Sequence, residues 1–442
     1  MAVLENENTK LPVHESYEKV ERDVMAAMST PSIWWWLALA FSATCFVIGM
    51  GFWGYMIFVG MGVAGIQNPV SWGIFIVNFV FWVGIAHSGT LISAVLFLFR
   101  ARFRNRFNRA AEAMTIFAVM TAGLFPLIHL GRVWFAYYLF PYPNQRQLWP
   151  NFKSPLVWDV FAVSTYFTVS AIFFYVGLIP DLAIARRRST GWRHWLYRIL
   201  SLGWNGSSSQ WKHYNKLYAL LAAFATPLVI SVHSVVSWDF AMSVIPGWHT
   251  TIFPPYFVAG AILSGTAMVL TLMIPMRRIL NLEDLLTIKH FENLAQLLLL
   301  TSLIVSYAYS VEWVIAFYSI NPFEIYHFMQ RIVGDYNWAY AVMITCNSIL
   351  PLLIFWKKFR TNLTCLFVLS IFVNIGMWFE RFVIIVVSLA RDFVPYAWGN
   401  YKPTIVEWGI MIGSFGLFFM LFLLFTKILP VLAMTEIKEE YK

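Results

Sequence analysis

The chain has 442 residues, of which 60% are hydrophobic and only 12% are charged. Soluble domains carry about 25% charged residues, so this composition excludes an ordinary soluble protein. The formal net charge of +9 does not indicate a nucleic-acid surface, because the basic residues gather in loops between apolar segments, where they favour contact with anionic membrane lipids.

Apolar runs long enough to cross a bilayer as helices recur along the whole chain. A hydrocarbon core of about 30 Å requires about 20 apolar residues in helical form. Continuous runs of this kind are not typical of membrane barrels, whose strands alternate between apolar and polar residues. The fold class predicted is an all-α integral membrane protein with ten transmembrane helices, at residues 33–62, 72–99, 110–139, 155–186, 213–244, 251–279, 292–320, 336–357, 362–390 and 403–430.

Lys and Arg divide unevenly between alternate loops. The two terminal segments and the even-numbered connections hold 24 of the 31 Lys and Arg residues, whereas the other five connections hold 5. Loops rich in basic residues remain in the cytoplasm. Both termini are therefore expected to be cytoplasmic, with residues 1–32 and 431–442 as cytoplasmic segments of a multi-pass protein.

Two short motifs indicate an internal repeat. Ser88-Gly89-Thr90 in the second predicted helix and Ser264-Gly265-Thr266 in the sixth are each followed by an apolar stretch and then by arginine. With a small shift, Glu112 in the third helix corresponds to Glu292 in the seventh. The alternative is that motifs of small residues recur by chance in membrane helices, where they favour close packing.

The repeat predicts two related four-helix bundles. Helices 2–5 (residues 72–244) form the first, and helices 6–9 (residues 251–390) form the second. Both start on the outer side, so they are parallel repeats and not inverted ones. Helix 1 (residues 33–62) and helix 10 (residues 403–430) are expected to flank the pair.

Nine ionisable side chains lie inside the predicted helices, nearly all of them in the outer half of the membrane. An ionisable group in hydrocarbon is costly unless it is paired or lines a cavity, so this set is a candidate functional site. The set comprises His87, His129, Arg132, Asp159, His233, Asp239, Glu312, Glu380 and Arg381. Three further carboxylates at cytoplasmic helix ends, Asp181, Glu283 and Asp284, are expected to be solvated.

The third and fourth helices carry the strongest candidates. His129 and Arg132 are three residues apart, which places them on one face of a helix. The chain then returns through the loop 140–154 and presents Asp159 just inside the next helix. At 1.5 Å per residue, His129 is expected about 14 Å below the outer helix end and Asp159 about 7 Å below it. This offset is comparable to the separation of the two oxygens of a quinone ring.

A quinol releases two electrons and two protons, so each hydroxyl group needs a neighbour that accepts a proton near neutral pH. Histidine does so with its ordinary pKa, and a buried carboxylate does so as well. We therefore predict quinol binding by His129 and Asp159, with Arg132 beside them and with His233 and Asp239 from the outer third of helix 5. Alternatively, His129 is a hydrogen-bonded packing residue, and Arg132 neutralises Asp159.

The remaining intramembrane residues have less specific assignments. His87, Glu312, Glu380 and Arg381 are candidates for a proton path. Two alternatives are open: the adjacent Glu380 and Arg381 form a structural ion pair or a coupling element, and His87 makes a polar contact with neighbouring Ser and Thr residues.

The sequence argues against metal cofactors in this chain. Its three cysteines, Cys45, Cys346 and Cys365, lie in apolar runs without the spacing of haem-attachment, zinc or iron–sulfur motifs. Two b-type haems need four histidine ligands, and only three of the nine histidines are intramembrane. A single haem held by two of these three is the alternative.

The main alternative function outside the oxidoreductases is that of a secondary transporter, because helix repeats with buried carboxylates are common in transporters. Two features argue against it: the charged residues crowd one side and not the midplane, and no pair of Gly/Pro-broken helices occupies matching positions.

The chain resembles the NrfD/PsrC family of quinone-reactive membrane subunits, and within it those of bacterial alternative complex III. The resemblance covers essentially the full length. It is carried by the motifs Gly84-Ile85-Ala86-His87-Ser88-Gly89-Thr90, Leu127-Ile128-His129-Leu130-Gly131-Arg132, Pro155-Leu156-Val157-Trp158-Asp159 and Ser231-Val232-His233-Ser234-Val235-Val236-Ser237-Trp238-Asp239.

This resemblance implies a subunit without haem or iron–sulfur cluster that binds menaquinol near the periplasmic face of a bacterial inner membrane. Electrons would pass to an iron–sulfur, molybdopterin-enzyme-like peripheral subunit and then to a c-type multihaem cytochrome. A second NrfD-like subunit and a terminal oxidase are further implied partners, and conduction of protons through the bundles is also implied. The alternative within this class is a relative that reduces quinone in a polysulfide reductase, nitrite reductase or hydrogenase-type complex. The family's His and Asp correspond to His129 and Asp159.

Overall fold

The computed structural model describes residues 13–29, 31–140 and 154–441. Within this part of the chain, every regular element is helical. Ten helical segments are long and apolar enough to span a membrane, as the sequence predicts. Their bounds are Ile33–Val59, Ile74–Leu98, Asn108–His129, Pro155–Arg188, Ser208–Ala241, Phe253–Ile279, Ile288–Tyr318, Asn337–Phe355, Leu363–Ala390 and Ile405–Ile428.

Seven of these spans are single helices, and three are interrupted by other helical turns. The single helices are α2 (Ile33–Val59), α5 (Asn108–His129), α6 (Pro155–Arg188), α8 (Ser208–Ala241), α9 (Phe253–Ile279), α10 (Ile288–Tyr318) and α16 (Ile405–Ile428). The composite spans are α3 (Ile74–Thr90) with η3 (Leu91–Val95) and α4 (Leu96–Leu98), α12 (Asn337–Ile344) with η6 (Thr345–Ile349) and η7 (Leu350–Phe355), and α14 (Leu363–Phe382) with η8 (Val383–Val387) and α15 (Ser388–Ala390).

Each composite span contains one π-helical turn, at η3, η6 and η8. A π turn holds one residue more than an α turn and is frequent at functional sites. All three turns adjoin buried polar side chains: Thr90 precedes η3, Asn347 lies within η6, and Glu380 and Arg381 precede η8.

The third span is shorter than predicted. The sequence suggests a helix to residue 139, but α5 ends at His129. Gly131 adopts a positive φ of 73°, a conformation that ends α-helices and that glycine adopts without a steric penalty. The chain continues as the separate 3-10 helix η5 (Val133–Leu139).

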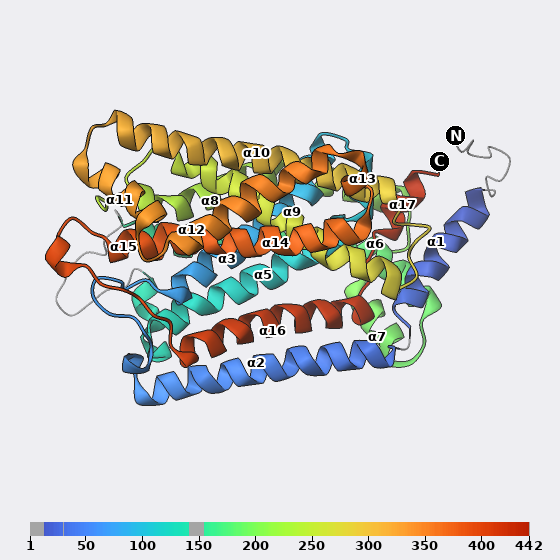
Figure 1. The fold of residues 1–442 in the computed structure, drawn as a ribbon. Helices are drawn as coiled ribbons and strands as arrows, with labels where there is room; N and C mark the ends of the chain where they lie inside the picture. Colours follow the sequence, from blue (N-terminus) through green and yellow to red (C-terminus); the bar gives the residue numbers. More distant parts are fainter. Residues whose placement is uncertain (1–12, 30, 141–153, 442) are drawn as a thin grey trace.

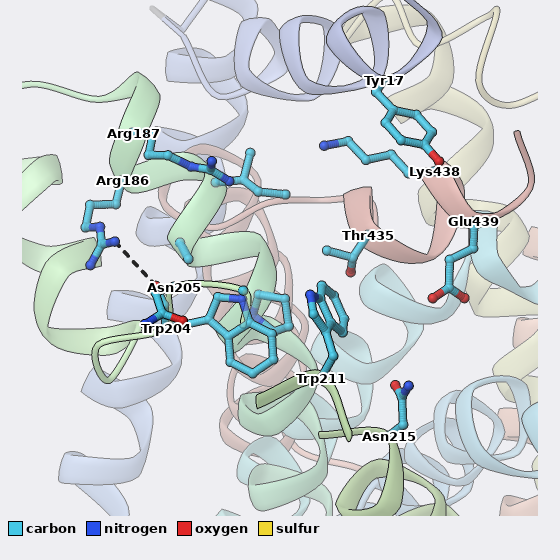
Figure 2. A pocket seen from close by; sticks show the side chains of 14 residues that line it. Tyr17, Arg186, Arg187, Trp204, Asn205, Trp211, Asn215, Thr435, Lys438 and Glu439 are labelled. Carbon is cyan, nitrogen blue, oxygen red and sulfur yellow. Dashed lines mark hydrogen bonds between the residues drawn. The ribbon is translucent and has the colours of Figure 1, made fainter. Parts of the chain in front are cut away.

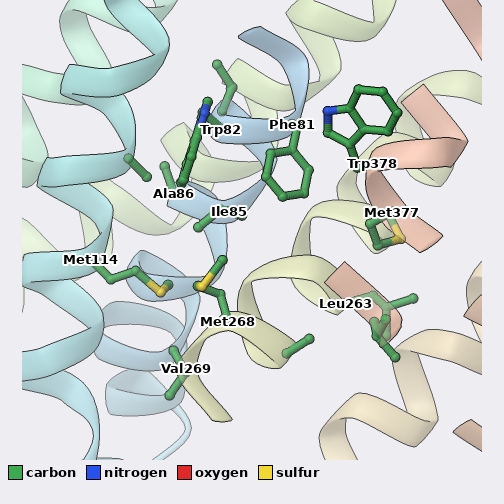
Figure 3. Packing of buried hydrophobic residues seen from close by; sticks show 14 of the residues in the cluster. Phe81, Trp82, Ile85, Ala86, Met114, Leu263, Met268, Val269, Met377 and Trp378 are labelled. Atoms are coloured by element: carbon green, nitrogen blue, oxygen red, sulfur yellow. The ribbon is translucent and has the colours of Figure 1, made fainter. Parts of the chain in front are cut away.

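The spans form an elongated bundle with α3 at its centre (Figure 1). In the most apolar part of the α3 span 83% of residues are buried inside the protein, compared with 17% in α2. Side chains from α3, α5, α9 and α14 meet in the core shown in Figure 3, where Trp82, Met114, Met268 and Trp378 are among the labelled residues. The indole groups of Trp82 and Trp378 donate hydrogen bonds to Ser414 and Asn78, at 3.1 Å and 2.8 Å.

The two Ser-Gly-Thr motifs lie against each other where α3 and α9 cross. Ser88 Oγ and Thr266 Oγ1 are 3.2 Å apart. A Cβ atom on Gly265 would lie 2.2 Å from Ser88 Cβ, so only glycine permits this approach. The motifs are therefore packing elements between α3 and α9, whereas the division into two repeated bundles stays a prediction.

Helices α2 and α16 form an antiparallel pair along one side of the bundle (Figure 1). A Cβ atom on Gly49 would lie 2.5 Å from Gly413 Cα, so the two backbones are in direct contact. Small residues at such crossings allow membrane helices to approach closely.

The shorter helices outside the spans lie at one or the other end of the bundle. Helices α1 (Val13–Ala27), α7 (Gly191–Leu200), α13 (Lys357–Arg360) and α17 (Met434–Glu439) lie at one end, which we call the basic end. Helices α11 (Pro322–Val333) and η9 (Pro395–Ala397) lie at the other, which we call the opposite end. Helices α1 and α17 are in contact, and Glu21 forms ion pairs with both Lys438 and Arg188.

Candidate functional site

Two aspartates from neighbouring helices meet near the opposite end. Asp159 lies in the first turns of α6, which begins at Pro155, and Asp239 lies in the last turn of α8. Their carboxyl groups interact with each other, and one oxygen of each is buried without a hydrogen-bond partner. Trp158 and Trp238 pack edge to face at 5.8 Å beside them. Two carboxylates in contact repel each other when both are ionised, so a shared proton stabilises this pair.

His129 reaches the same end of the bundle from α5. Because α5 ends at this residue, His129 lies at the helix terminus and not about 14 Å below it, as the sequence suggests. Its ring is partly buried, and Nδ1 has no hydrogen-bond partner. The carboxyl group of Asp159 faces Asp239 and not the His129 ring.

Arg132 does not share a helix face with His129, so this prediction is wrong. The left-handed Gly131 ends the helix, and Arg132 follows in an extended conformation with an exposed side chain. Within the described residues it forms no ion pair with Asp159. Residues 141–153 of the loop that connects it to α6 lie outside the described part.

A second polar group lies at the centre of the bundle. His87 on α3 and His233 on α8 are fully buried, with ring centroids 4.5 Å apart. His87 stacks on Tyr166 of α6 at 4.7 Å, and its Nδ1 lies 2.5 Å from the carbonyl oxygen of Val83. His87 Nε2 and both ring nitrogens of His233 have no hydrogen-bond partner. His233 therefore contacts His87 and not Asp239, with which the sequence grouped it.

This geometry leaves no room for a haem between the two histidines. Axial ligands lie on opposite faces of the macrocycle, but these two rings are in van der Waals contact. Among the described residues, no group of three or more His, Cys, Asp and Glu side chains is arranged to hold a metal ion.

Beyond His233, a charged group extends toward the opposite end. The Arg381 guanidinium lies 4.5 Å from the Phe257 ring centroid, and Phe257 in turn packs on His233. Arg381 forms an ion pair with Glu380 at 2.7 Å. Tyr309 donates a hydrogen bond to Glu380 and accepts one from Asn347 at 3.0 Å. Glu380 and Arg381 are therefore an ion pair within a larger buried network.

Glu312 has a partner that the sequence did not reveal. Arg331 lies on α11, between the seventh and eighth spans, and its buried guanidinium is 3.6 Å from Glu312. Arg331 Nε also donates to His327 Nε2 at 3.3 Å. Glu312 and Glu324 line a cavity of about 190 Å³ at this end. The only signal in the sequence was the amphipathic pattern of residues 322–333.

A second charged cluster lies near the basic end. Arg109 pairs with Glu112 at 2.9 Å and with Asp181 at 2.9 Å. Asp181 also accepts hydrogen bonds from the backbone and hydroxyl groups of Thr435, both at 3.0 Å. The prediction that Asp181 is solvated is wrong, because its side chain is completely buried. Glu283 and Asp284 are exposed as predicted, with 49% and 71% of their side chains accessible.

This cluster adjoins a cavity of about 350 Å³ lined in part by Arg104, Tyr218 and Glu436. Tyr218 donates to Glu112 at 3.3 Å, and Arg104 lies 2.7 Å from Glu436. Burial raises the pKa of Glu436, although Arg104 opposes this effect.

Buried polar side chains thus occur at successive levels between the two ends. Starting from the basic end, Glu112 lies one turn of α5 before Thr115. Thr115 and Tyr166 both donate hydrogen bonds to the carbonyl oxygen of Ala86, at 2.7 Å and 2.9 Å. Tyr166 stacks on His87, which leads through His233 and Arg381 to Glu380 and then to the Glu312 cavity. We call this set the polar chain.

Known proteins are similar to this chain in sequence over most of its length. The chain is 26% identical over 422 residues to a protein of Halobacterium salinarum described as a membrane subunit of dimethyl sulfoxide reductase, covering 89% of this chain and 90% of that one. It is 25% identical to the C subunit of selenate reductase from Mesobacillus selenatarsenatis, covering 84% and 88% of the two chains. It is 21% identical to the Hdr-like menaquinol oxidoreductase integral membrane subunit of Archaeoglobus fulgidus, covering 89% and 94%.

The match to a family profile is confined to the central spans. Residues 62–391 match the family described as polysulphide reductase, NrfD, and this range includes α3 to α15 but neither α2 nor α16. With three quarters of its length matched in this way, the chain belongs to the NrfD family.

Proposed function

We propose that this chain is the quinol-binding membrane subunit of a respiratory oxidoreductase, and that it oxidises menaquinol near the opposite end. The observation that carries this proposal is the buried Asp159–Asp239 pair, whose unpartnered carboxyl oxygens lie at the same end as the free His129 Nδ1. These groups suit a ligand with two hydroxyl groups that must each lose a proton.

The residues would act as proton acceptors and as orienting groups. In the oxidation, one quinol becomes one quinone, two electrons and two protons. An ionised carboxylate of the Asp159–Asp239 pair would accept one proton, and the neutral imidazole of His129 would accept the other. Trp158 and Trp238 would provide an aromatic wall beside the ring.

The electrons require a partner subunit that accepts them, since the family resemblance implies no redox cofactor in this chain. We propose that an iron–sulfur, molybdopterin-enzyme-like subunit docks on the opposite end, and that a multihaem c-type cytochrome, a second NrfD-like subunit and a terminal oxidase follow it. Exposed aromatic side chains at this end are suited to such docking: Tyr396 is 99% exposed and Tyr318 87%. The related membrane subunits bear the names of reductases and of a menaquinol oxidoreductase, which supports an assembly of this kind.

The distribution of charge sets the proposed orientation. The basic end holds most of the Lys and Arg residues and both terminal helices, α1 and α17. By the positive-inside rule this end faces the cytoplasm, so the Asp159–Asp239 pair lies near the periplasmic face of a bacterial inner membrane.

The polar chain supports a second part of the proposal, which is coupled proton translocation. It runs between a cavity at each end, and at each mouth burial raises the pKa of a carboxyl group, Glu436 at the basic end and Glu324 at the opposite end. Such groups bind and release protons closer to neutral pH than an exposed glutamate does. His87 is the central member, because its ring contacts both Tyr166 and His233.

The first experiment tests the acid pair. Asp159→Asn and Asp239→Asn, in the purified complex, are expected to lower the quinol oxidation rate by at least about 100-fold while assembly is retained, because the amide accepts no proton. Asp335→Asn is the matched control, since Asp335 lies at the same end with 60% of its side chain exposed. Wild-type turnover in both assembled variants would exclude the pair from the site. Quinone reduction alone, or uptake of a solute by the isolated chain, would instead favour a quinone-reducing complex or a transporter.

The second experiment tests the polar chain. His87→Phe preserves the aromatic contact with Tyr166 but carries no proton. In proteoliposomes, we expect quinol oxidation to continue with its own release of two protons, while any additional translocated protons are lost. His213→Gln, an exposed change at the basic end, is the control. An unchanged ratio of protons to electrons in His87→Phe would contradict the proposed path.

A further inference from the structure

The largest of the cavities described lies at the basic end, away from the groups discussed above. Its volume is about 660 Å³, and it is bounded by the last turns of α6, the segment 204–206, the start of α8, and helices α1 and α17. Figure 2 shows Arg186, Arg187 and Lys438 around it, together with Trp204 and Trp211. Three cations thus line this cavity against one carboxylate, that of Glu439.

Two of these cations have no acidic partner in the described part of the chain. Arg186 donates only to the Ser201 hydroxyl and the Trp204 carbonyl, both at 3.4 Å. Arg187 is exposed and forms no ion pair. The adjacent Arg188, in contrast, pairs with Glu21 at 2.6 Å, and Lys438 pairs with the same carboxylate. The guanidinium groups that line the cavity are therefore available to an anion, whereas Arg188 and Lys438 already share one carboxylate.

The surroundings of the cavity indicate the membrane interface. The amphipathic helix α7 is separated by three residues from the segment 204–206 and exposes Trp192 and Trp195, at 62% and 64%. Trp204 and Trp211 pack edge to face at 5.0 Å on the cavity wall. Tryptophan concentrates at the level of lipid headgroups, and basic pockets at the cytoplasmic side of helices bind lipid phosphates.

We infer that this cavity binds the headgroup of an anionic phospholipid, with its phosphate held by Arg186 and Arg187 and its glycerol region against Trp204 and Trp211. Guanidinium groups suit a phosphate because they donate paired hydrogen bonds. The bound lipid would lie among α1, α6, α8 and α17, and so would connect the two terminal helices to the bundle. This lipid site rests on the proposed orientation, with the basic end at the cytoplasmic face, and is independent of the quinol chemistry.

The experiment compares lipid retention by full-length variants in mild detergent. Native mass spectrometry of the delipidated chain, titrated with phosphatidylglycerol, is expected to show one retained lipid. Arg186→Gln with Arg187→Gln should weaken this binding about 30-fold, which is about 1 kcal/mol for each basic residue at the interface. The matched control is Lys357→Gln with Lys358→Gln, which removes the same charge from α13, outside the cavity.

Three further arms distinguish the sources of the anion. If inorganic phosphate competes at the same concentration as phosphatidylglycerol, the site binds a free anion and not a lipid. If phosphatidylcholine is retained equally well, binding does not require a negatively charged headgroup. Equal binding by Arg186→Gln with Arg187→Gln and by the α13 control would place the lipid elsewhere. A circular dichroism spectrum and a thermal midpoint like those of the control establish that the arginine variant is folded, and Arg186→Lys with Arg187→Lys should restore part of the binding.

Discussion

Gly177 on α6 illustrates how single residues permit the buried charges of this protein. A Cβ atom at this position would lie 2.7 Å from Arg109 Nη1. The Arg109 guanidinium cannot move away freely, because it is bonded to Glu112, Asp181 and the Gly177 carbonyl. The absence of a side chain at residue 177 therefore allows the arginine to lie fully buried between α5 and α6.

We predict that Gly177→Ala lowers the free energy of unfolding by about 1–3 kcal/mol, the range for overpacking in a well-packed interior. The measurement is the unfolding midpoint of the purified chain in detergent. Gly123→Ala on α5 is the control, because a Cβ atom there meets nothing within 4 Å and alanine favours the helix. A loss of stability equal in both variants would show that the Arg109 contact is not the cause.

At this scale, the sequence identified candidate residues better than it identified their partners. It located His87, Asp159, Asp239 and Glu380 because ionisable residues stand out in apolar runs. It could not pair Asp159 with Asp239, since 80 positions separate them and the contact depends on how α6 packs on α8. Their catalytic roles stay predictions.

Asp181 and Arg331 show the limits of such reasoning more clearly. Both lie near the ends of helices, where the same residue types are most often solvated. Their burial follows from tertiary packing, of Asp181 against α17 and of Arg331 against α10, which no local pattern encodes.

Among the elements, α1 depends on charge for its attachment to α17. Burial raises the pKa of Glu21, but hydrogen bonds from Lys438 and Arg188 outweigh this effect, and the pKa lies below its ordinary value of 4.5. A carboxyl group whose folded pKa is lowered contributes stability above its unfolded pKa and loses it as the pH falls through the folded pKa.

We therefore predict that α1 is held at neutral pH and released in acid. Hydrogen exchange of residues 13–27, corrected for the intrinsic effect of pH, should show protection at pH 7 that decreases below about pH 4.5, where the ordinary carboxyl group begins to bind a proton. In Glu21→Gln the protection should be weak at both pH values. A wild-type helix equally protected across this range would mean that apolar contacts, such as those of Val20 and Val24, are sufficient.

The spans themselves were predicted well, because a run of apolar residues has a single explanation in a membrane. The one large error, at the end of α5, arose because residues 133–139 are as apolar as a helix interior. The conformation of Gly131, which ends the helix, is not visible in a hydropathy pattern.

For the whole molecule, an even number of spans places α1 and α17 at one end and η9 at the other. Tyr396 on η9 is almost completely exposed, and Ser209 at the start of α8 is exposed at the basic end. These two positions report on the two sides of the membrane.

We predict that, when the chain is expressed without its partner subunits, a membrane-impermeant maleimide labels Tyr396→Cys in intact spheroplasts but labels Ser209→Cys only after the membrane is opened. The background would carry serine in place of the three native cysteines, Cys45, Cys346 and Cys365. Labelling in the reverse order would invert the proposed orientation and place the Asp159–Asp239 pair at the cytoplasmic face.

The three π turns have a consequence for how this molecule tolerates change in length. The extra residue in each π turn rotates the rest of its span by about 100° about the helix axis. Which side chains face the core after the turn therefore depends on that one extra residue. Excising one amino acid from such a turn would restore ordinary winding yet swing the remainder of the span out of alignment with its neighbours. Shortening these spans would accordingly be more damaging than a conservative replacement of one of their apolar side chains.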